Sequence, residues 1–222
     1  SRKHDLAELT EKSRSKGVTT VWDLAHSAGV IEISLAKYQV DFAVGCTYKY
    51  LNGGPGAPAF IYVSPRHANK IVPILAGWLG HVDPFSFADN FVPANGVDRM
   101  RVGTPPIISL SALEAALEIW SNINIRDVRE ASKRLTEMFI ERVDRSCPKL
   151  TLLSPRNPNH RGSHVAYKFE EGYALVQALI SRGVIGDFRA PETIRFGFSP
   201  LFIDEDDIVK ATDIIAEVID NN

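Results

Sequence analysis

Hydrophobic and polar positions follow two periods along the chain, and the change of period predicts helices and strands in turn. Residues 4–16 carry leucines at helical spacing, and Gly17 follows them as a stop signal. A β-branched run at 18–26 predicts a strand that ends at Asp23. Two further strands are expected at 43–50 (AVGCTYKY) and 60–63 (FIYV), with the glycine- and proline-rich block LNGGPGAPA between them.

The second half of the chain continues this alternation after an irregular stretch. Residues 64–105 hold Pro, Gly, Asp and Asn among scattered aromatic residues, which is typical of a binding site or an interface. Residues 107–145 carry a long helical pattern. After it we expect two strands, a helix closed by Gly183, two more strands and a last helix at about 204–220. The alternation predicts an α/β fold with a mainly parallel sheet.

Length and composition narrow the class of protein. The 222 residues are enough for one large domain or two small ones, and we place the boundary so that 1–145, with the long linking helix, forms one domain and 146–222 the other. A net charge of −2 leaves no basic excess for a phosphate backbone, so no nucleic-acid partner is expected. The apolar runs are too short for a membrane span. Two cysteines, Cys46 and Cys147, make no disulfide framework, which is typical of a reducing cytoplasm.

The segment VWDLAHSAG places a carboxylate at the end of a predicted strand. Asp23 interrupts an apolar run, and the carboxyl ends of strands are where open α/β sheets bind ligands. Taken alone, such an aspartate is more often an N-cap or a turn residue. His26 lies three residues on, where a hydrogen-bonded structural histidine is the commoner interpretation. The neighbouring residues do not give the spacing of metal ligands, so no metal is expected.

The segment GCTYKYLNGGPGAPA offers a possible nucleophile. Lys49 stands between two tyrosines, after a small apolar strand and before the glycine-rich block. A lysine that is removed from water in such a place is a nucleophile for imine formation. A surface lysine before a glycine-rich turn is an equally good interpretation of this segment alone. The block is not a P-loop, because the lysine precedes the glycines and no GK[ST] is present.

The segment ETIRFGFSPLF places a cation inside an apolar strand. Arg195 is flanked by Ile194 and Phe196. A buried arginine requires a carboxylate, either from the protein or from a substrate. An internal salt bridge is the common alternative, and Arg189 in GDFRAP competes for the substrate role.

Together, Asp23, Lys49 and Arg195 resemble the set of the aminotransferase-like superfamily of pyridoxal-phosphate (PLP) enzymes. Within it, DLAHSAG, YKYLNGGPGAPAF, AGWLGH, GTPPI, GDFRAP and IRFGFSPL resemble the kynureninases nearly end to end. The resemblance implies a PLP-dependent transferase-like fold of the aspartate-aminotransferase type, comprising part of the large domain and a smaller α+β C-terminal domain. Family members run to roughly twice this length, so the chain resembles the C-terminal half, and we expect it to bind PLP poorly on its own.

The resemblance implies a role for each matched residue. Lys49 is implied as the lysine that holds PLP covalently and moves the Cα proton, and Asp23 as the partner of the pyridine nitrogen. His26 would line the cofactor or substrate pocket. Tyr48 would hydrogen-bond the cofactor phosphate and assist proton transfer.

The remaining matched residues concern the substrate and a second subunit. Trp78 and Thr104 are implied as phosphate contacts from the neighbouring subunit, so the resemblance implies a homodimer with shared sites. Arg195 is implied as the anchor for the carboxylate of a small amino-acid substrate. His81 and Arg189 are weaker candidates, for which packing is the simpler explanation.

The implied activity is that of a PLP-dependent hydrolase acting on a C–C bond. It would convert L-kynurenine or 3-hydroxykynurenine to anthranilate or 3-hydroxyanthranilate and L-alanine, in tryptophan catabolism and NAD biosynthesis. One open alternative is another PLP lyase of the superfamily, such as a cysteine-desulfurase-like enzyme, although Cys46 and Cys147 are poorly placed for a mobile nucleophile. Another is a non-catalytic domain, against which the joint presence of Lys49, Asp23 and Arg195 counts.

Overall fold

The structure, a computed structural model, describes residues 1–220 and divides into two compact units. One unit holds residues 5–28 and 33–121. The other holds residues 1–4 and 29–32 together with the chain from residue 122 onward. The domain boundary that we expected at 145 stays a prediction for the whole protein.

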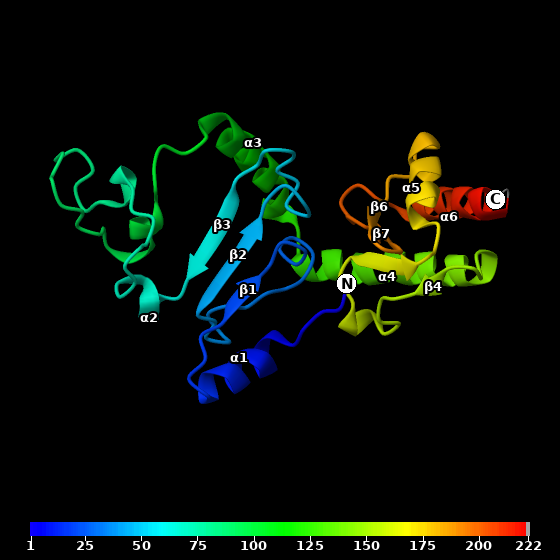
Figure 1. The fold of residues 1–222 in the computed structure, drawn as a ribbon, viewed down its shortest axis with the longest axis horizontal. Helices are drawn as coiled ribbons and strands as arrows, with labels where there is room; N and C mark the ends of the chain where they lie inside the picture. Colours follow the sequence, from blue (N-terminus) through cyan, green and yellow to red (C-terminus); the bar gives the residue numbers. More distant parts are fainter. Residues whose placement is uncertain (221–222) are drawn as a thin grey trace. The chain divides into compact units, whose positions relative to one another are not determined.

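The first unit is built around a three-stranded sheet. Strands β1 (Val21–Asp23) and β2 (Phe42–Cys46) are parallel, and β3 (Ala59–Val63) is antiparallel to β2, in the order β1-β2-β3 (Figure 1). The described strands thus form a mixed sheet where we expected a mainly parallel one, because the glycine-rich block turns the chain straight back from β2 into β3. Around them lie α1 (Leu6–Ser15), α2 (Pro65–Ala68), η1 (Trp78–Gly80), η2 (Gly96–Met100), α3 (Ile107–Glu118) and η3 (Ile119–Asn122).

A buried carboxylate holds the starts of β1 and β2 together. Asp41 accepts hydrogen bonds from the backbone N and the hydroxyl of Thr20, at 3.1 and 3.2 Å, just before β1. It also accepts from Arg66 Nη2 at 2.5 Å and contacts His67 Nε2 at 2.6 Å, both on α2. Burial alone would raise the pKa of Asp41, but the hydrogen bonds from His67, Thr20 and Arg66 outweigh it and hold that pKa well below its usual range.

The second unit is a four-stranded antiparallel sheet with helices. The predicted pairs of strands, and the helices between and after them, are confirmed, and the sheet order is β4-β5-β7-β6. The elements are α4 (Ile125–Ser146), β4 (Thr151–Leu152), η4 (Pro158–His160), β5 (His164–Lys168), α5 (Gly172–Ser181), β6 (Asp187–Arg189), β7 (Thr193–Gly197) and α6 (Glu205–Asp220). At its centre the ring of Phe139 on α4 contacts Tyr167, Phe196 and Phe198.

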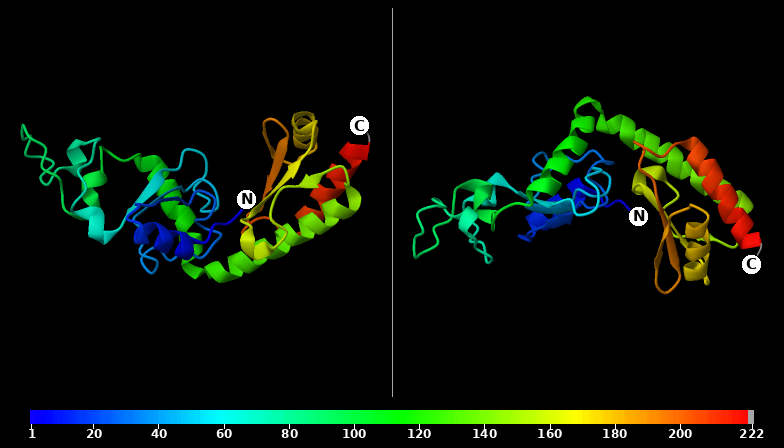
Figure 2. Two further views of the ribbon diagram at one scale, coloured as in Figure 1. Left: turned by 60° about the horizontal axis from the view of Figure 1, so that its bottom comes forward. Right: turned by 90° about the horizontal axis from the view of Figure 1, so that it is seen from above.

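The long helical pattern at 107–145 is two helices rather than one. α3 ends at Glu118, and the short η3 turn separates it from α4. Asn124 then begins α4, because its side chain accepts a hydrogen bond from the backbone N of Arg126. α4 packs alongside α6 within the second unit (Figure 2).

Candidate functional site

The carboxyl ends of β1 and β2 bring the first two candidate residues to one edge of the sheet. The strands are parallel, with Asp23 in register with Val44 (Figure 1). Leu24 continues the pairing by donating from its backbone N to Val44 O at 2.8 Å. The turn after Asp23 and the loop that carries Lys49 therefore leave the sheet from the same edge, which is the ligand-binding edge of an α/β sheet.

Lys49 lies against a histidine at this edge. Its Nζ is 3.1 Å from His26 Nε2 and 3.5 Å from Nδ1, and it lies 5.4 Å from the ring centre of Tyr48. The side chain of Lys49 is half-buried, whereas those of His26 and Tyr48 are exposed. A neutral imidazole nitrogen accepts a hydrogen bond from an amine, so His26 can hold the end of the Lys49 side chain at this edge.

Asp23 is exposed and makes a local turn contact. Its Oδ1 accepts a hydrogen bond from the backbone N of Ala25 at 2.8 Å. This contact is the turn role that is common for such an aspartate, and it directs the chain toward His26. The turn therefore places an acid and an imidazole at the edge of the sheet where the loop after β2 brings the amine of Lys49.

The glycine-rich block fixes the loop that carries Lys49. The hydroxyl of Thr47 donates to Pro58 O at 2.5 Å, and the backbone N of Gly53 donates to Thr47 O at 2.9 Å. A Cβ on Gly53 would come within 2.9 Å of both Thr47 O and Ala57 Cβ, so the chain packs here as only glycine allows. The block thus closes the loop on itself.

Trp78 and Thr104 lie in a second cluster of the same unit. The position of a Cβ on Gly103, next to Thr104, is 3.7 Å from Trp78 Nε1, so the structure brings the AGWLGH and GTPPI segments together. Gly77 allows this approach, because a Cβ there would lie 1.7 Å from Val102 O. Trp78 and Thr104 are both exposed.

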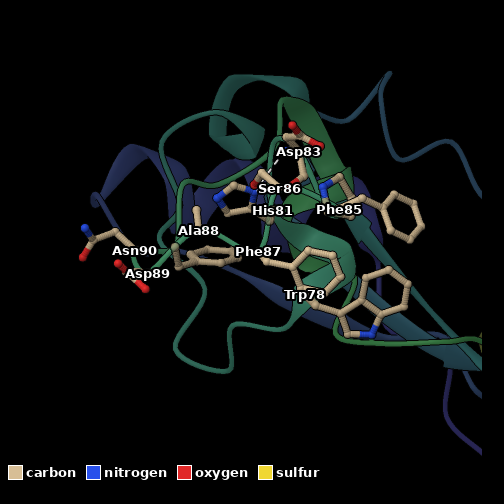
Figure 3. A pocket seen from close by; sticks show the side chains of 11 residues that line it. Trp78, His81, Asp83, Phe85, Ser86, Phe87, Ala88, Asp89 and Asn90 are labelled. Carbon is tan, nitrogen blue, oxygen red and sulfur yellow. Dashed lines mark hydrogen bonds between the residues drawn. The ribbon is translucent and has the colours of Figure 1, made fainter.

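A cavity of about 520 Å³ opens beside Trp78 (Figure 3). Residues 83–91 line it together with Trp78 and His81, and the Phe85 ring lies 5.7 Å from the Trp78 ring. His81 itself makes local contacts, with Nδ1 2.7 Å from Asp83 O and its ring edge-on to Phe91. These contacts agree with the packing role that we expected for His81.

Arg195 belongs to the second unit and holds a carboxylate of this chain. Its Nε donates to Asp187 Oδ1 at 2.7 Å, and its Nη2 donates to Asp187 Oδ2 at 2.6 Å. The hydrogen bond from Arg195 holds the pKa of Asp187 below its usual range. The arginine therefore makes the bidentate carboxylate contact that its chemistry favours, here with an internal partner.

Sequence reasoning missed two of these contacts. The pair of Lys49 with His26 and the pair of Arg195 with Asp187 both depend on which strands are neighbours. The GDFR motif was a signal for the second pair, because antiparallel strands joined by a short loop set 187 opposite 195.

In the part of the chain that the structure describes, His, Cys, Asp and Glu side chains form no group of three that could hold a metal ion. Within residues 1–220, no helix has the length and apolar character to cross a bilayer.

Comparison with solved structures identifies the fold. The chain superposes on a cysteine desulfurase from Thermococcus onnurineus with a TM-score of 0.84 and 19% identity, covering 100% of this chain and 57% of that one. The cysteine desulfurase CsdA of Escherichia coli gives 0.81 at 19% identity, over 98% of this chain and 55% of that one. At these identities the likeness concerns the fold alone, which is the expected PLP-dependent transferase-like fold.

Comparison of sequences shows which named proteins this chain is similar to. The model of the kynureninase C-terminal domain matches residues 128–215. A kynureninase from Pseudomonas fluorescens is 44% identical over 219 residues, 98% of this chain and 53% of that protein. One from Deinococcus radiodurans is 43% identical over 221 residues, 99% of this chain and 54% of that protein. The chain thus spans about half the length of these relatives, and it is similar to kynureninases over nearly all of its own length.

Proposed function

We propose that the whole protein is a PLP-dependent hydrolase that cleaves L-kynurenine, 3-hydroxykynurenine or both. The products would be L-alanine and the matching anthranilate. The observation that carries this proposal is the common edge of β1 and β2, where Asp23 ends β1, Lys49 follows the adjacent parallel strand β2, and His26 lies 3.1 Å from the amine. The similarity to named kynureninases supports the choice of substrate.

The side chains at this edge fit PLP by their chemistry. A lysine amine is the group that holds an aldehyde carbon, and a carboxylate is the partner of a protonated pyridine nitrogen. We propose Lys49 for the first role and Asp23 for the second. When bound, PLP supplies an electron sink beside the Cα of an amino acid. The chain shares its fold with the cystine C-S lyase C-DES, one structure of which is described with glycine covalently linked to its PLP cofactor. This similarity of fold supports the proposal.

The residues of this chain would divide the remaining work. Lys49 is proposed to take the Cα proton of the substrate, and Tyr48 to assist proton transfer and to donate to the phosphate, with His26 lining the pocket. A proton acceptor works within hydrogen-bonding reach of its target, and the closed loop fixes the backbone from which the Lys49 side chain extends. Arg195 is proposed to bind the α-carboxylate, and the bidentate geometry of its contact with the Asp187 carboxylate supports this proposal.

A homodimer would complete the site. We propose that Trp78 and Thr104 donate to the phosphate bound by the partner subunit. The exposure of both residues supports this proposal, as do the exposed apolar side chains nearby, such as Ile74, Leu75 and Ile108.

We also propose that the protein is cytoplasmic and has no nucleic-acid or membrane partner. The net charge of −2 and the two free cysteines support this proposal.

The two cysteines do not favour the cysteine-desulfurase alternative. A desulfurase requires an exposed and mobile thiolate. Cys147 is fully buried, and burial raises the pKa of its thiol. Cys46 ends β2, with its Sγ 3.7 Å from Ala25 O.

A substrate comparison tests the proposed function. The whole protein, saturated with PLP, is assayed with L-kynurenine, 3-hydroxykynurenine and L-cysteine. We expect an anthranilate product from at least one of the two kynurenines and no sulfide from cysteine. Release of sulfide without cleavage of either kynurenine would favour the desulfurase, and absence of all three activities would favour a non-catalytic domain.

A further inference from the structure

Asp187 lies directly opposite Arg195 on the β6–β7 hairpin. The two residues are partners in the antiparallel register, so their side chains lie on the same face of the sheet. Two hydrogen bonds of 2.7 and 2.6 Å join the Nε–Nη2 edge of the guanidinium to both carboxylate oxygens. A bidentate contact of this kind fixes the plane of the guanidinium as well as its distance.

A second arginine keeps this pair from being electrically neutral. Arg189, two residues along β6 from Asp187, places Nη2 3.3 Å from Asp187 Oδ2. The two guanidinium groups and one carboxylate together carry a formal charge of +1. The Arg195 side chain is 24% exposed and that of Asp187 is 46% exposed, so the cluster remains open to solvent. An incoming carboxylate would therefore meet a positively charged cluster.

We propose that Asp187 is a positioning residue for carboxylate binding by Arg195. The proposal rests on the proposed function, in which Arg195 binds the α-carboxylate of the amino-acid substrate. Asp187 holds the guanidinium in one orientation before the substrate arrives, so less side-chain freedom is lost on binding. Arg189 offsets the negative charge of Asp187. If Asp187 were instead a competitor of the substrate carboxylate, its removal would tighten binding.

Three variants of the whole protein, loaded with PLP, test this role. Asp187→Asn removes the charge and one acceptor, and Asp187→Ala removes the contact. Glu192→Gln is the matched control, because Glu192 lies on the same hairpin and its carboxylate pairs with Lys168 at 2.7 Å. Each variant is compared with the wild type for its interaction with three ligands. These are L-kynurenine, the decarboxylated amine of kynurenine, and L-alanine.

We expect Asp187→Asn to raise KM for L-kynurenine about tenfold, which is the size of one charged hydrogen bond. The value of kcat should change less than about twofold. The inhibition constant of the decarboxylated amine should not change, because that ligand has no carboxylate for Arg195. Glu192→Gln should leave both values unchanged. Equal losses for the two ligands, or tighter carboxylate binding in the Asp187 variants, would overturn the proposal.

Two further measurements keep the outcome interpretable. Binding of L-alanine, followed by calorimetry, needs no turnover, so it tests Asp187 even if the wild type fails to hydrolyse kynurenine and the proposed function falls. Asp187→Glu keeps the charge and serves if the other variants unfold. Its longer side chain shifts the carboxylate against Arg195, so we expect it to bind L-alanine more weakly than the wild type and than Glu192→Gln, and unchanged or tighter binding would count against a positioning role.

Discussion

At the scale of single residues, one buried carboxylate joins separate parts of the first unit. Asp41 receives hydrogen bonds from the backbone before β1 and from two cationic or titratable side chains on α2. Its partners come from two separate stretches of sequence, at Thr20 and at Arg66 and His67. The loss of such a group leaves several donors without their acceptor, which is costly in a buried place.

We therefore expect Asp41→Asn to lower the free energy of unfolding by about 2–3 kcal/mol at neutral pH. Because the pKa of Asp41 is depressed in the folded state, its contribution is fully present above the unfolded pKa of about 4 and is lost as the pH falls below it. Denaturant unfolding at several pH values measures this. The difference between the wild type and Asp41→Asn should shrink in acid.

A matched exposed pair serves as the control for this prediction. Asp98 lies 3.7 Å from Arg101, and both side chains are more than half exposed. Asp98→Asn should change stability by less than about 0.5 kcal/mol, as exposed ion pairs usually do. An equal loss in both variants would mean that the buried position of Asp41 does not matter.

Residue types at strand ends could be predicted from sequence, but their partners could not. Asp23, Lys49 and Arg195 stand out because each interrupts or ends an apolar run. The partners His26 and Asp187 depend on strand pairing and register, which a local pattern does not contain. The loop contacts that hold Lys49 were hidden for the same reason, since Thr47 meets Pro58 across eleven residues.

At the scale of elements, two glycines decide how the segments around Trp78 pack. Gly77 and Gly80 both lie against the backbone of residues 99–102. A backbone contact cannot give way as the end of a flexible side chain can. This part of the unit is therefore sensitive to a single added methyl group.

Gly77→Ala should destabilise the whole protein by about 2 kcal/mol or more, because the added Cβ would clash with Val102 O. Gly103→Ala is the control, since the nearest atom to its Cβ is at an ordinary contact distance of 3.7 Å. Thermal unfolding of both variants measures the effect. Equal melting temperatures for the two variants would contradict the close packing of Gly77.

The elements themselves were largely predictable. The strand at 60–63 and the last helix at 204–220 closely match β3 and α6, because each has a clear period and clear end signals. The break between α3 and α4 was missed, since the apolar pattern continues through Ile119 and Trp120. The sheet direction was missed because order along the chain does not fix the sense of each pair.

At the scale of the whole molecule, the proposed dimer makes a prediction that no single site can explain. If Trp78 serves the partner's cofactor, a dimer that joins a Lys49→Ala subunit to a Trp78→Ala subunit contains one site with both defects and one intact site. Mixing and refolding the two inactive variants should then restore part of the activity. Activity that stays absent in verified mixed dimers would place Trp78 in the site of its own subunit.

The proposed function requires the amine of Lys49 to hold the cofactor. Borohydride reduction of the whole protein with bound PLP, followed by peptide mapping of the reduced adduct, tests this requirement. We expect one stable pyridoxyl group on Lys49 and no such label in Lys49→Ala. A label on another lysine, or no label on the wild type after reduction, would contradict it.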